Sequence, residues 1–242
     1  MPVVYCAGEK SGNGNKKGRP PGFIRTEPSL IKYADGRSCP ITDMYADTNL
    51  TNKIKESVIM DRAQGLALLY EFTETESLRK HAYAVEKAMR DYAGKFNEDE
   101  ELWGLIGLIH DFDYEKYPQE HPMKGAEILA ERGVPESIRR IILGHADFSK
   151  VPRDTLAAKT LYAVDELCGF IVAVTLVRPT RSVSEVQVKS VKKKMKDKRF
   201  AAKVNRDEII RGAEELGIPF DEHVSFVIQA LSGVAEEIGL NP

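Results

Sequence analysis

Cysteine is scarce in this sequence, and the few that occur are widely separated. The 242 residues include three, Cys6, Cys39 and Cys168. An odd number of isolated cysteines argues against a disulfide framework and for a reducing compartment, so we expect a cytoplasmic protein. Cys6 and Cys39 also lack nearby Cys or His partners, which argues against a zinc site in the N-terminal region.

Long apolar runs are also lacking. No stretch approaches the 18 apolar residues of a transmembrane helix, and the closest, CGFIVAVTLV at 168–177, is long enough only for a core helix. The first residues lack the apolar stretch and the small-residue cleavage site of a signal peptide. We therefore expect no membrane segment and no secretion signal.

The chain carries almost no net charge, because its 35 Lys and Arg nearly balance its 37 Asp and Glu. Overall charge therefore identifies no partner. A hydrophobic content of 42% and a charged content of 30% are ordinary for a soluble globular protein. The length suits one good-sized domain with an extension.

Residues 1–59 differ in composition from the rest of the chain. The tract EKSGNGNKKGRPPG at 9–22 cannot bury an apolar face, and it lacks the G-x-x-x-x-G-K-[ST] spacing of a phosphate loop. The polar, turn-rich segment that follows continues to residue 59. We expect 1–59 to be a disordered or irregular N-terminal extension and 60–242 to be the folded domain.

From residue 60 onward, apolar residues recur at helical spacing, and no segment shows convincing strand alternation. The helices begin at capping residues such as Thr75 and Asn97 and end at signals such as Gly133. The pattern predicts an all-α fold, a single multi-helix bundle. The expected helical ranges are 60–72, 76–96, 97–112, 121–133, 135–146, 155–177, 184–198, 206–217 and 221–239.

Four of the five histidines lie between positions 81 and 145, each on or at the end of an expected core helix. Any one of them alone is typical of a core histidine. Asp165, however, lies in the apolar stretch LYAVDELCGF, where a buried carboxylate is costly unless it is paired or holds a metal. Histidines and a carboxylate converging on a cation would explain both features. From the residues alone, a metal site and a set of core histidines remain alternatives.

Three motifs resemble the HD-domain metal-dependent phosphohydrolases: His81 in SLRKHAYAVEKAM, the pair His110-Asp111 in GLIGLIHDFDYEK, and Asp165. The resemblance covers about residues 60–240. The segments 175–209 and 212–218 are similar to a subgroup of small stand-alone bacterial or archaeal HD hydrolases. The resemblance implies an all-α HD domain in which these four side chains hold one metal ion.

The segment HPMKGAEIL also resembles the His-Pro-x-x-Gly segment of the cyclic-dinucleotide phosphodiesterase branch, which makes His121 a candidate for a second metal or for phosphate. His145 lies where that branch carries paired histidines and is a candidate for the same roles. Here the second histidine of the pair is replaced by Ala146, and the Gly-Tyr-Pro signature is missing. These departures argue against a cyclic-dinucleotide substrate.

The implied enzyme cleaves a small phosphomonoester, a nucleotide or a related phosphoester by metal-activated water. The cofactor is a divalent ion (Mn, Fe, Zn, Co, Ni or Mg), one per chain, with two as the alternative. Asp111 and Asp113 are the catalytic candidates; Asp113 is alternatively a solvated turn acid. The candidates for binding substrate phosphate, each alternatively a plain surface residue, are Lys116, Lys124, Arg178 and Arg181.

Residues 178–206 carry eleven Lys and Arg against Glu185 and Asp197. One interpretation of this excess is a solvated helix face, which we favour for most of the lysines. The other is a function of a different class, a catalytically silent HD fold that binds nucleotide or RNA through the segment. Phe200 is its single aromatic residue, so base stacking is not indicated, and a small phosphorylated substrate is favoured over nucleic acid. His223 has no identifiable partner in the sequence and receives no role.

Overall fold

The computed structural model describes residues 30–32, 38–40 and 60–241. The chain divides into two units, Met1–Met44 and Tyr45–Pro242. In the first unit, strands β1 (Leu30–Lys32) and β2 (Ser38–Pro40) pair antiparallel, with Leu30 opposite Pro40. Strands of three residues are too short to show alternation, so the sequence did not reveal them. The remainder of 1–59 lies outside the described residues, and the predicted disordered extension and the boundary at residue 60 stay predictions.

The described part of the second unit is all-α, as predicted. Its α-helices are α2 (Arg62–Phe72), α3 (Glu76–Phe96), α4 (Glu100–Ile109), α5 (Met123–Glu131), α6 (Glu136–Leu143), α7 (Leu156–Leu176), α8 (Val188–Met195), α9 (Arg206–Leu216) and α10 (Phe220–Ser232). Short 3₁₀ turns occur at Asp147–Ser149 and Val183–Glu185. Five helices are shorter than expected: 97–112, 121–133, 135–146 and 184–198 reduce to α4, α5, α6 and α8, and 221–239 ends at Ser232.

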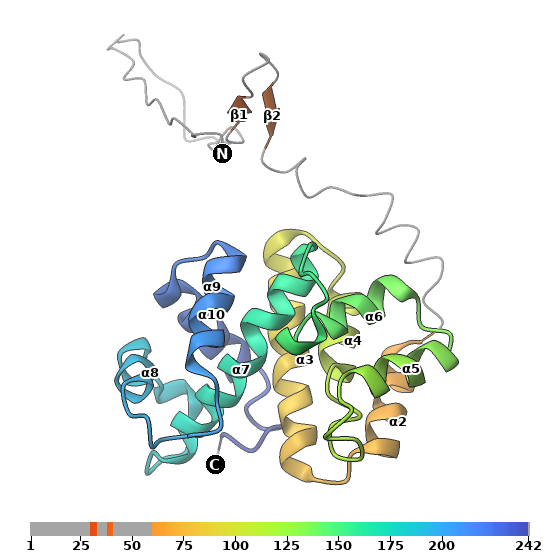
Figure 1. Cartoon of the computed structure of the whole chain (residues 1–242). Coiled ribbons are helices and arrows are strands. Elements are labelled where there is room, and N and C mark those ends of the chain that lie inside the picture. The colour runs from red at the N-terminus through yellow and green to blue at the C-terminus, as the bar shows by residue number, and fades with distance from the viewer. Residues whose placement is uncertain (1–29, 33–37, 41–59, 242) are drawn as a thin grey trace, which may run out of the picture. The chain divides into compact units, whose positions relative to one another are not determined.

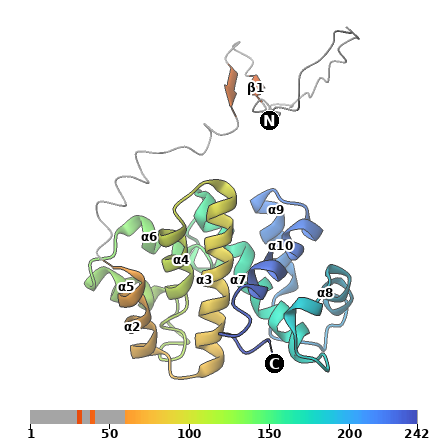
Figure 2. The same ribbon diagram turned by 180° about the vertical axis from the view of Figure 1, so that it is seen from behind.

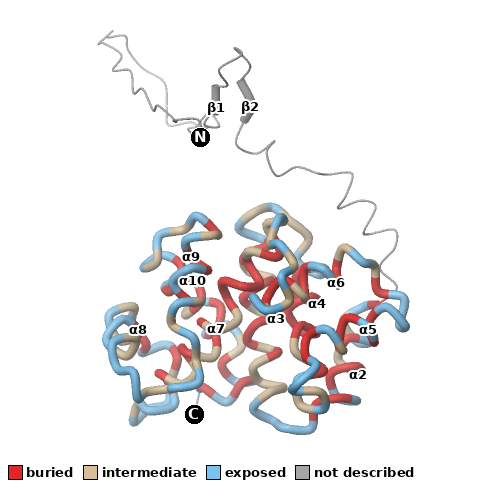
Figure 3. Tube along the Cα trace, viewed as in Figure 1, coloured by how far each residue is buried: buried red, intermediate tan, exposed pale blue. Residues whose placement is uncertain are grey.

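Helices α3, α4 and α7 form the centre of this unit (Figures 1 and 2). Helix α3 packs extensively on α4 and also contacts α7, while α2 packs on α4 and α9 packs on α7. Most residues of α7 are buried, as are most residues of α4 and many of α3 (Figure 3). The central helices therefore lie within rigid, apolar surroundings, and polar groups on their facing sides are held in fixed positions.

Helix α4 is the most deeply buried of the short helices. Its first turn is capped by Asp99, whose carboxylate accepts from the backbone N–H of Glu101 and Leu102, and every residue from Trp103 to Ile109 is buried. Gly107 allows the close approach to α3, since a Cβ there would lie 2.9 Å from the carbonyl oxygen of Val85. Close packing of α3 on α4 brings the end of α4 beside the middle of α3.

His223 on α10 is fully buried and links three helices. Its Nε2 donates to the carbonyl oxygen of Ala163 on α7 at 2.9 Å, and its Nδ1 accepts from the hydroxyl of Tyr92 on α3 at 2.6 Å. Burial lowers the pKa of His223 to about 4. The histidine that had no role in the sequence is thus a neutral core residue that joins α10 to α3 and α7.

Within the described residues, no helix combines the length and the apolar character needed to cross a bilayer.

Candidate metal centre

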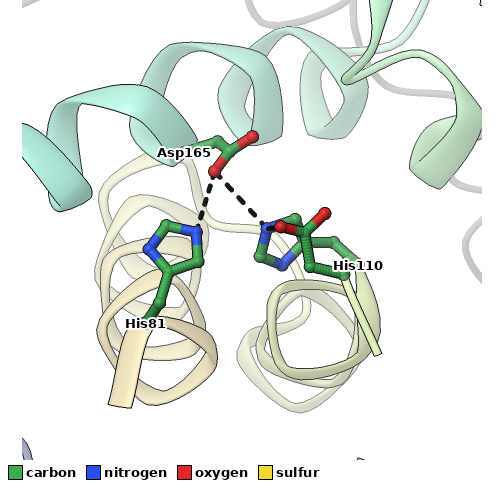
Figure 4. Close-up of side chains that lie close together, drawn as sticks. His81, His110 and Asp165 are labelled. Atoms are coloured by element: carbon green, nitrogen blue, oxygen red, sulfur yellow. Dashed lines mark hydrogen bonds and ion pairs between the residues drawn. The ribbon is translucent and has the colours of Figure 1, made fainter. Parts of the chain in front are cut away.

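Three helices bring two imidazoles and a carboxylate together at the centre of the bundle. His81 extends from α3, His110 follows the last residue of α4, and Asp165 lies in the middle of α7. Figure 4 shows the two imidazole rings side by side below the Asp165 carboxylate, each with a nitrogen turned toward it. The Nε2 atoms of His81 and His110 lie 3.0 Å and 3.4 Å from Asp165 Oδ1.

The orientation of His110 is fixed by its own helix. Its Nδ1 donates to the carbonyl oxygen of Gly107 at 2.7 Å, so a neutral ring carries its lone pair on Nε2. That atom faces the carboxylates of Asp165 and Asp111, the latter through Oδ2 at 3.6 Å. The end of a rigid helix therefore delivers an imidazole lone pair and a carboxylate side by side.

A second group of side chains meets the other oxygen of the Asp111 carboxylate. Oδ1 lies 3.1 Å from Nε2 of His121 and 3.2 Å from Nε2 of His145. The two Nε2 atoms are 3.2 Å apart. His121 comes from the loop before α5, and His145 follows the end of α6. The two candidates that the sequence assigned to a second metal or to phosphate are thus neighbours, and Asp111 touches both groups.

On the side away from Asp111, the Nδ1 atom of each of these two rings donates a hydrogen bond. His121 Nδ1 donates to Asp113 Oδ1 at 2.8 Å, and His145 Nδ1 donates to the carbonyl oxygen of Ile142 at 2.5 Å. Asp113 is 1% exposed, and its Oδ2 accepts from the backbone N–H of Gly125 at 2.8 Å. Asp113 therefore lies behind His121 as a buried hydrogen-bond acceptor, which excludes the alternative of a solvated turn acid.

The arrangement fits a divalent cation. Lone pairs of neutral imidazoles facing carboxylates repel one another unless a positive charge lies between them. His110 Nε2 and Asp111 Oδ1 are buried and make no hydrogen bond in spite of their close neighbours, which is the pattern of ligand atoms converging on an ion. Imidazole with carboxylate suits Mn, Fe, Co, Ni or Zn. Two groups have ligand atoms within 4.8 Å of one another: His81, His110, Asp111 and Asp165; and Asp111, His121 and His145.

The electrostatics of the centre are strongly negative. Burial alone would lower the pKa values of His110, His121 and His145, but the adjoining carboxylates outweigh burial and raise all three, that of His121 to about 10. Burial would likewise raise the pKa values of Asp111 and Asp165, yet the facing imidazoles, His110 first, hold both below the usual range. The same field that attracts protons to these nitrogens attracts a metal cation.

The two lysine candidates for substrate phosphate have partners outside the centre. Lys116 donates to the carbonyl oxygen of Glu71 at 2.6 Å and lies over the ring of Phe72. Lys124 pairs with Glu127 on its own helix at 3.0 Å. Neither contact involves a member of the His/Asp groups.

The two arginine candidates lie farther along the chain. Arg178 follows Asp165 by thirteen residues, which at 1.5 Å per helical residue is about 20 Å along the axis of α7. It pairs with Glu185 at 3.5 Å. Arg181 is exposed in the turn that follows. The structure therefore does not bring Arg178 or Arg181 beside the His/Asp groups.

One network behind the centre was not foreseen from the sequence. Arg153 donates to the carbonyl oxygen of Gly144, which directly precedes His145, and forms two 2.7 Å contacts with Glu215 on α9. Its guanidinium also pairs with Asp147 at 3.0 Å. These partners come from separate segments, and nothing in local spacing connects them.

Comparison with known families supports this reading of the geometry. The family model described as HD domain matches residues 78–169, a range that contains all the histidines and acids of the two groups. No curated protein and no solved structure matches the chain significantly. The matched range ends within α7, so α8, α9 and α10 lie beyond it.

Proposed function

This chain belongs to the HD-domain family, and on that premise we propose that it is a metal-dependent phosphohydrolase. His81, His110, Asp111 and Asp165 would hold one divalent ion. Asp111, His121 and His145 would hold a second. The proposed substrate is a small phosphomonoester, a nucleotide or a related phosphoester.

The observation that supports this proposal most strongly is the position of Asp111. Its Oδ2 faces His110, while its Oδ1 faces both His121 and His145. With one oxygen toward each group, Asp111 would belong to the ligand sets of both ions. Paired ions a few ångströms apart are typical of phosphatases and nucleases, in which they hold the attacking and leaving oxygens of a displacement at phosphorus.

Divalent ions in such sites supply two kinds of chemistry: they acidify a water molecule, and they neutralise charge on a phosphoryl group. The chain's own residues position that chemistry. Asp113 keeps the proton of His121 on Nδ1, which leaves Nε2 free to act as a ligand. The carbonyl oxygen of Gly107 does the same for His110.

Substrate would enter from the side on which the ligands remain partly exposed. The side chains of Asp111, Asp165 and His81 keep 23%, 17% and 20% of their surface, whereas His110 has none. Tyr114, 45% exposed, lies edge-on to the ring of His121 at 5.3 Å and borders this region. A substrate phosphate would approach the metal centre from this open side, with Tyr114 beside it.

The silent nucleotide- or RNA-binding protein is the alternative that the basic segment suggests. Phe200, the single aromatic residue of 178–206, packs edge-on against Phe170 at 5.6 Å and lies under Lys194. A ring engaged in this way is not free to stack on a base. The contacts therefore favour the hydrolase over this alternative.

The decisive experiment compares metal content and phosphate release. Purified wild type, incubated with Mn, Fe, Co, Ni, Zn or Mg salts and desalted, is expected to retain metal and to release phosphate from a panel of nucleoside monophosphates and other phosphomonoesters. Asp111→Asn should lose both properties. Asp91→Asn is the matched control, because Asp91 is a partly exposed acid of α3 that pairs with Lys87. A wild type that binds none of these metals would overturn the hydrolase and leave a helical binding protein.

A further inference from the structure

A cavity of about 830 Å³ lies among α8, α9 and the beginning of α10. Its lining residues fall between Lys192 and Phe220, so it contains no member of the His/Asp groups and lies wholly beyond the HD segment. Figures 1 and 2 show these three helices gathered on one side of the bundle, with α2, α5 and α6 on the other. The volume is in the range of pockets that bind small organic ligands. This cavity is therefore a candidate site separate from the metal centre.

The floor of the cavity is apolar, and part of it meets water. Ile210 on α9 is 44% exposed. Met195, Val204, Ile218 and Phe220 line the same space, and each packs against the core while remaining only partly buried. Apolar surface gathered in a concave site is stabilised when a ligand covers it.

The rim of the cavity carries an excess of positive charge. Four cationic side chains line it against the two acids Asp207 and Glu214. Lys192 pairs with Asp221 at 2.8 Å. Lys196 and Lys198 make no ion pair with any acid of the described residues. The two unpaired lysines leave the rim attractive to an anion.

Arg206 adds a fixed cation to this rim. Its guanidinium donates to the carbonyl oxygens of Ala201 at 2.8 Å and Val204 at 2.7 Å, and to that of Phe200. Its Nε is buried without a hydrogen-bond partner, and none of the acids in the described residues forms an ion pair with it. Arg206 is also the first residue of α9, where the helix dipole adds further positive potential.

We propose that this cavity binds a single-chain amphiphilic anion. The aliphatic chain would cover the floor formed by residues such as Ile210 and Met195. The anionic head would meet Lys196 and Lys198, and the charge of Arg206 would add to the positive potential there. An aliphatic body fits better than a nucleobase, because Phe220 is the one aromatic ring among the lining residues and Phe200 is engaged by Phe170. The proposal is independent of the chemistry at the metal centre.

Calorimetric titration of the full chain with decanoate, below its micelle concentration, tests the proposal. Wild type is expected to bind decanoate at about one per chain and to bind decan-1-ol at least tenfold more weakly. AMP, a candidate substrate of the metal centre, should bind equally to wild type and to Lys196→Gln/Lys198→Gln. The double variant Lys196→Gln/Lys198→Gln should lose at least tenfold in decanoate affinity. The matched control, Lys189→Gln/Lys193→Gln, removes the same charge from exposed positions of α8 that do not line the cavity, and it should bind as wild type.

A second variant tests the floor. Ala202 is exposed and lines the cavity, so Ala202→Trp should fill the space and abolish decanoate binding without unfolding the protein. Absence of decanoate binding to wild type would overturn the proposal. Equal losses in the two lysine pairs would also overturn it, since they would indicate unspecific attraction to a basic surface. AMP binding tighter than decanoate, and lost in Lys196→Gln/Lys198→Gln, would replace it with a nucleotide site.

Discussion

The guanidinium of Arg153 lies over the ring of Tyr162, with its Cζ 3.7 Å from the ring centroid. Tyr162 lies one turn before Asp165 on α7, and Arg153 donates to the carbonyl oxygen of Gly144, next to His145. The stacked pair therefore connects the segment that carries one ligand candidate to the helix that carries another. Glu215 on α9 completes the connection through two 2.7 Å contacts.

Arg153→Met is expected to weaken metal binding at the His121/His145 group by roughly ten- to a hundredfold, the usual effect of removing a group that orients a ligand. It would also destabilise the fold by roughly 3 kcal/mol, because Glu215 loses its two close contacts with Arg153 and keeps only Arg211 at 4.0 Å. Titration of the metal-free protein with Co²⁺, followed by its visible absorption, measures the affinity.

Arg90→Met is the control for this change. Arg90 has a side chain 17% exposed, close to the 13% of Arg153, and it contacts both Glu86 and Glu101 away from the centre. It should lower stability by a similar amount and leave Co²⁺ binding intact. Equal weakening of Co²⁺ binding in both variants would show that Arg153 acts through stability alone.

Asp113→Asn should change the tautomer of His121. The Asn oxygen can still accept from Gly125, and the amide N–H₂ would then face His121 Nδ1 and force that atom to accept a hydrogen bond. The ring proton moves to Nε2, which can no longer bind a metal. We expect a ten- to hundredfold loss of metal affinity and of any metal-dependent activity, with a small change in melting temperature. Unchanged Co²⁺ affinity in calorimetry would disprove the positioning role of Asp113.

Gly107→Ala should separate α3 from α4. The new Cβ would lie 2.9 Å from the Val85 carbonyl oxygen and 3.0 Å from the Glu86 backbone, atoms that cannot turn aside. We expect destabilisation by roughly 1–3 kcal/mol, measured by urea unfolding. Gly94→Ala is the control, since its Cβ meets the flexible end of Glu100, and helix propensity predicts a gain of up to about 1 kcal/mol.

The decrease in the free energy of unfolding at acidic pH should depend in part on His223. Because the folded pKa, about 4, lies below the ordinary value of 6.5, the unfolded chain binds the proton more readily between these values. Its contribution is fully present above about pH 6.5 and is lost as the pH falls toward 4, at most about 3 kcal/mol. His223→Gln should flatten the decline of stability between pH 6.5 and 4 in chemical unfolding. A slope identical to that of wild type would contradict this account.

The sequence predicted much of the fold and singled out the histidines and acids that the structure gathers at the centre. Helical spacing placed His81, His110 and Asp165 on core helices, and central helices that pack on one another bring such residues together. The sequence could not show that Arg178 lies far from the His/Asp groups. That separation follows from the length of α7 beyond Asp165 and from the position of Asp165 in the bundle, and the second of these is known only from the fold. The sequence also could not reveal the Arg153–Glu215 link, which joins residues 62 positions apart through tertiary packing alone. The buried position of Asp113 has the same cause, since it depends on how the loop after α4 meets Gly125.

The link between Arg153 and Glu215 has a consequence for modularity. The HD segment at 78–169 ends inside α7, whereas the partners of Arg153 and of Tyr92 reach into α9 and α10. Cut at the limits of the family match, the domain would retain its histidines and acids but lose Glu215, and Tyr92 would lose His223. We therefore infer that the C-terminal helices are an integral part of the domain that carries the candidate metal centre and cannot be exchanged as a separate appendage.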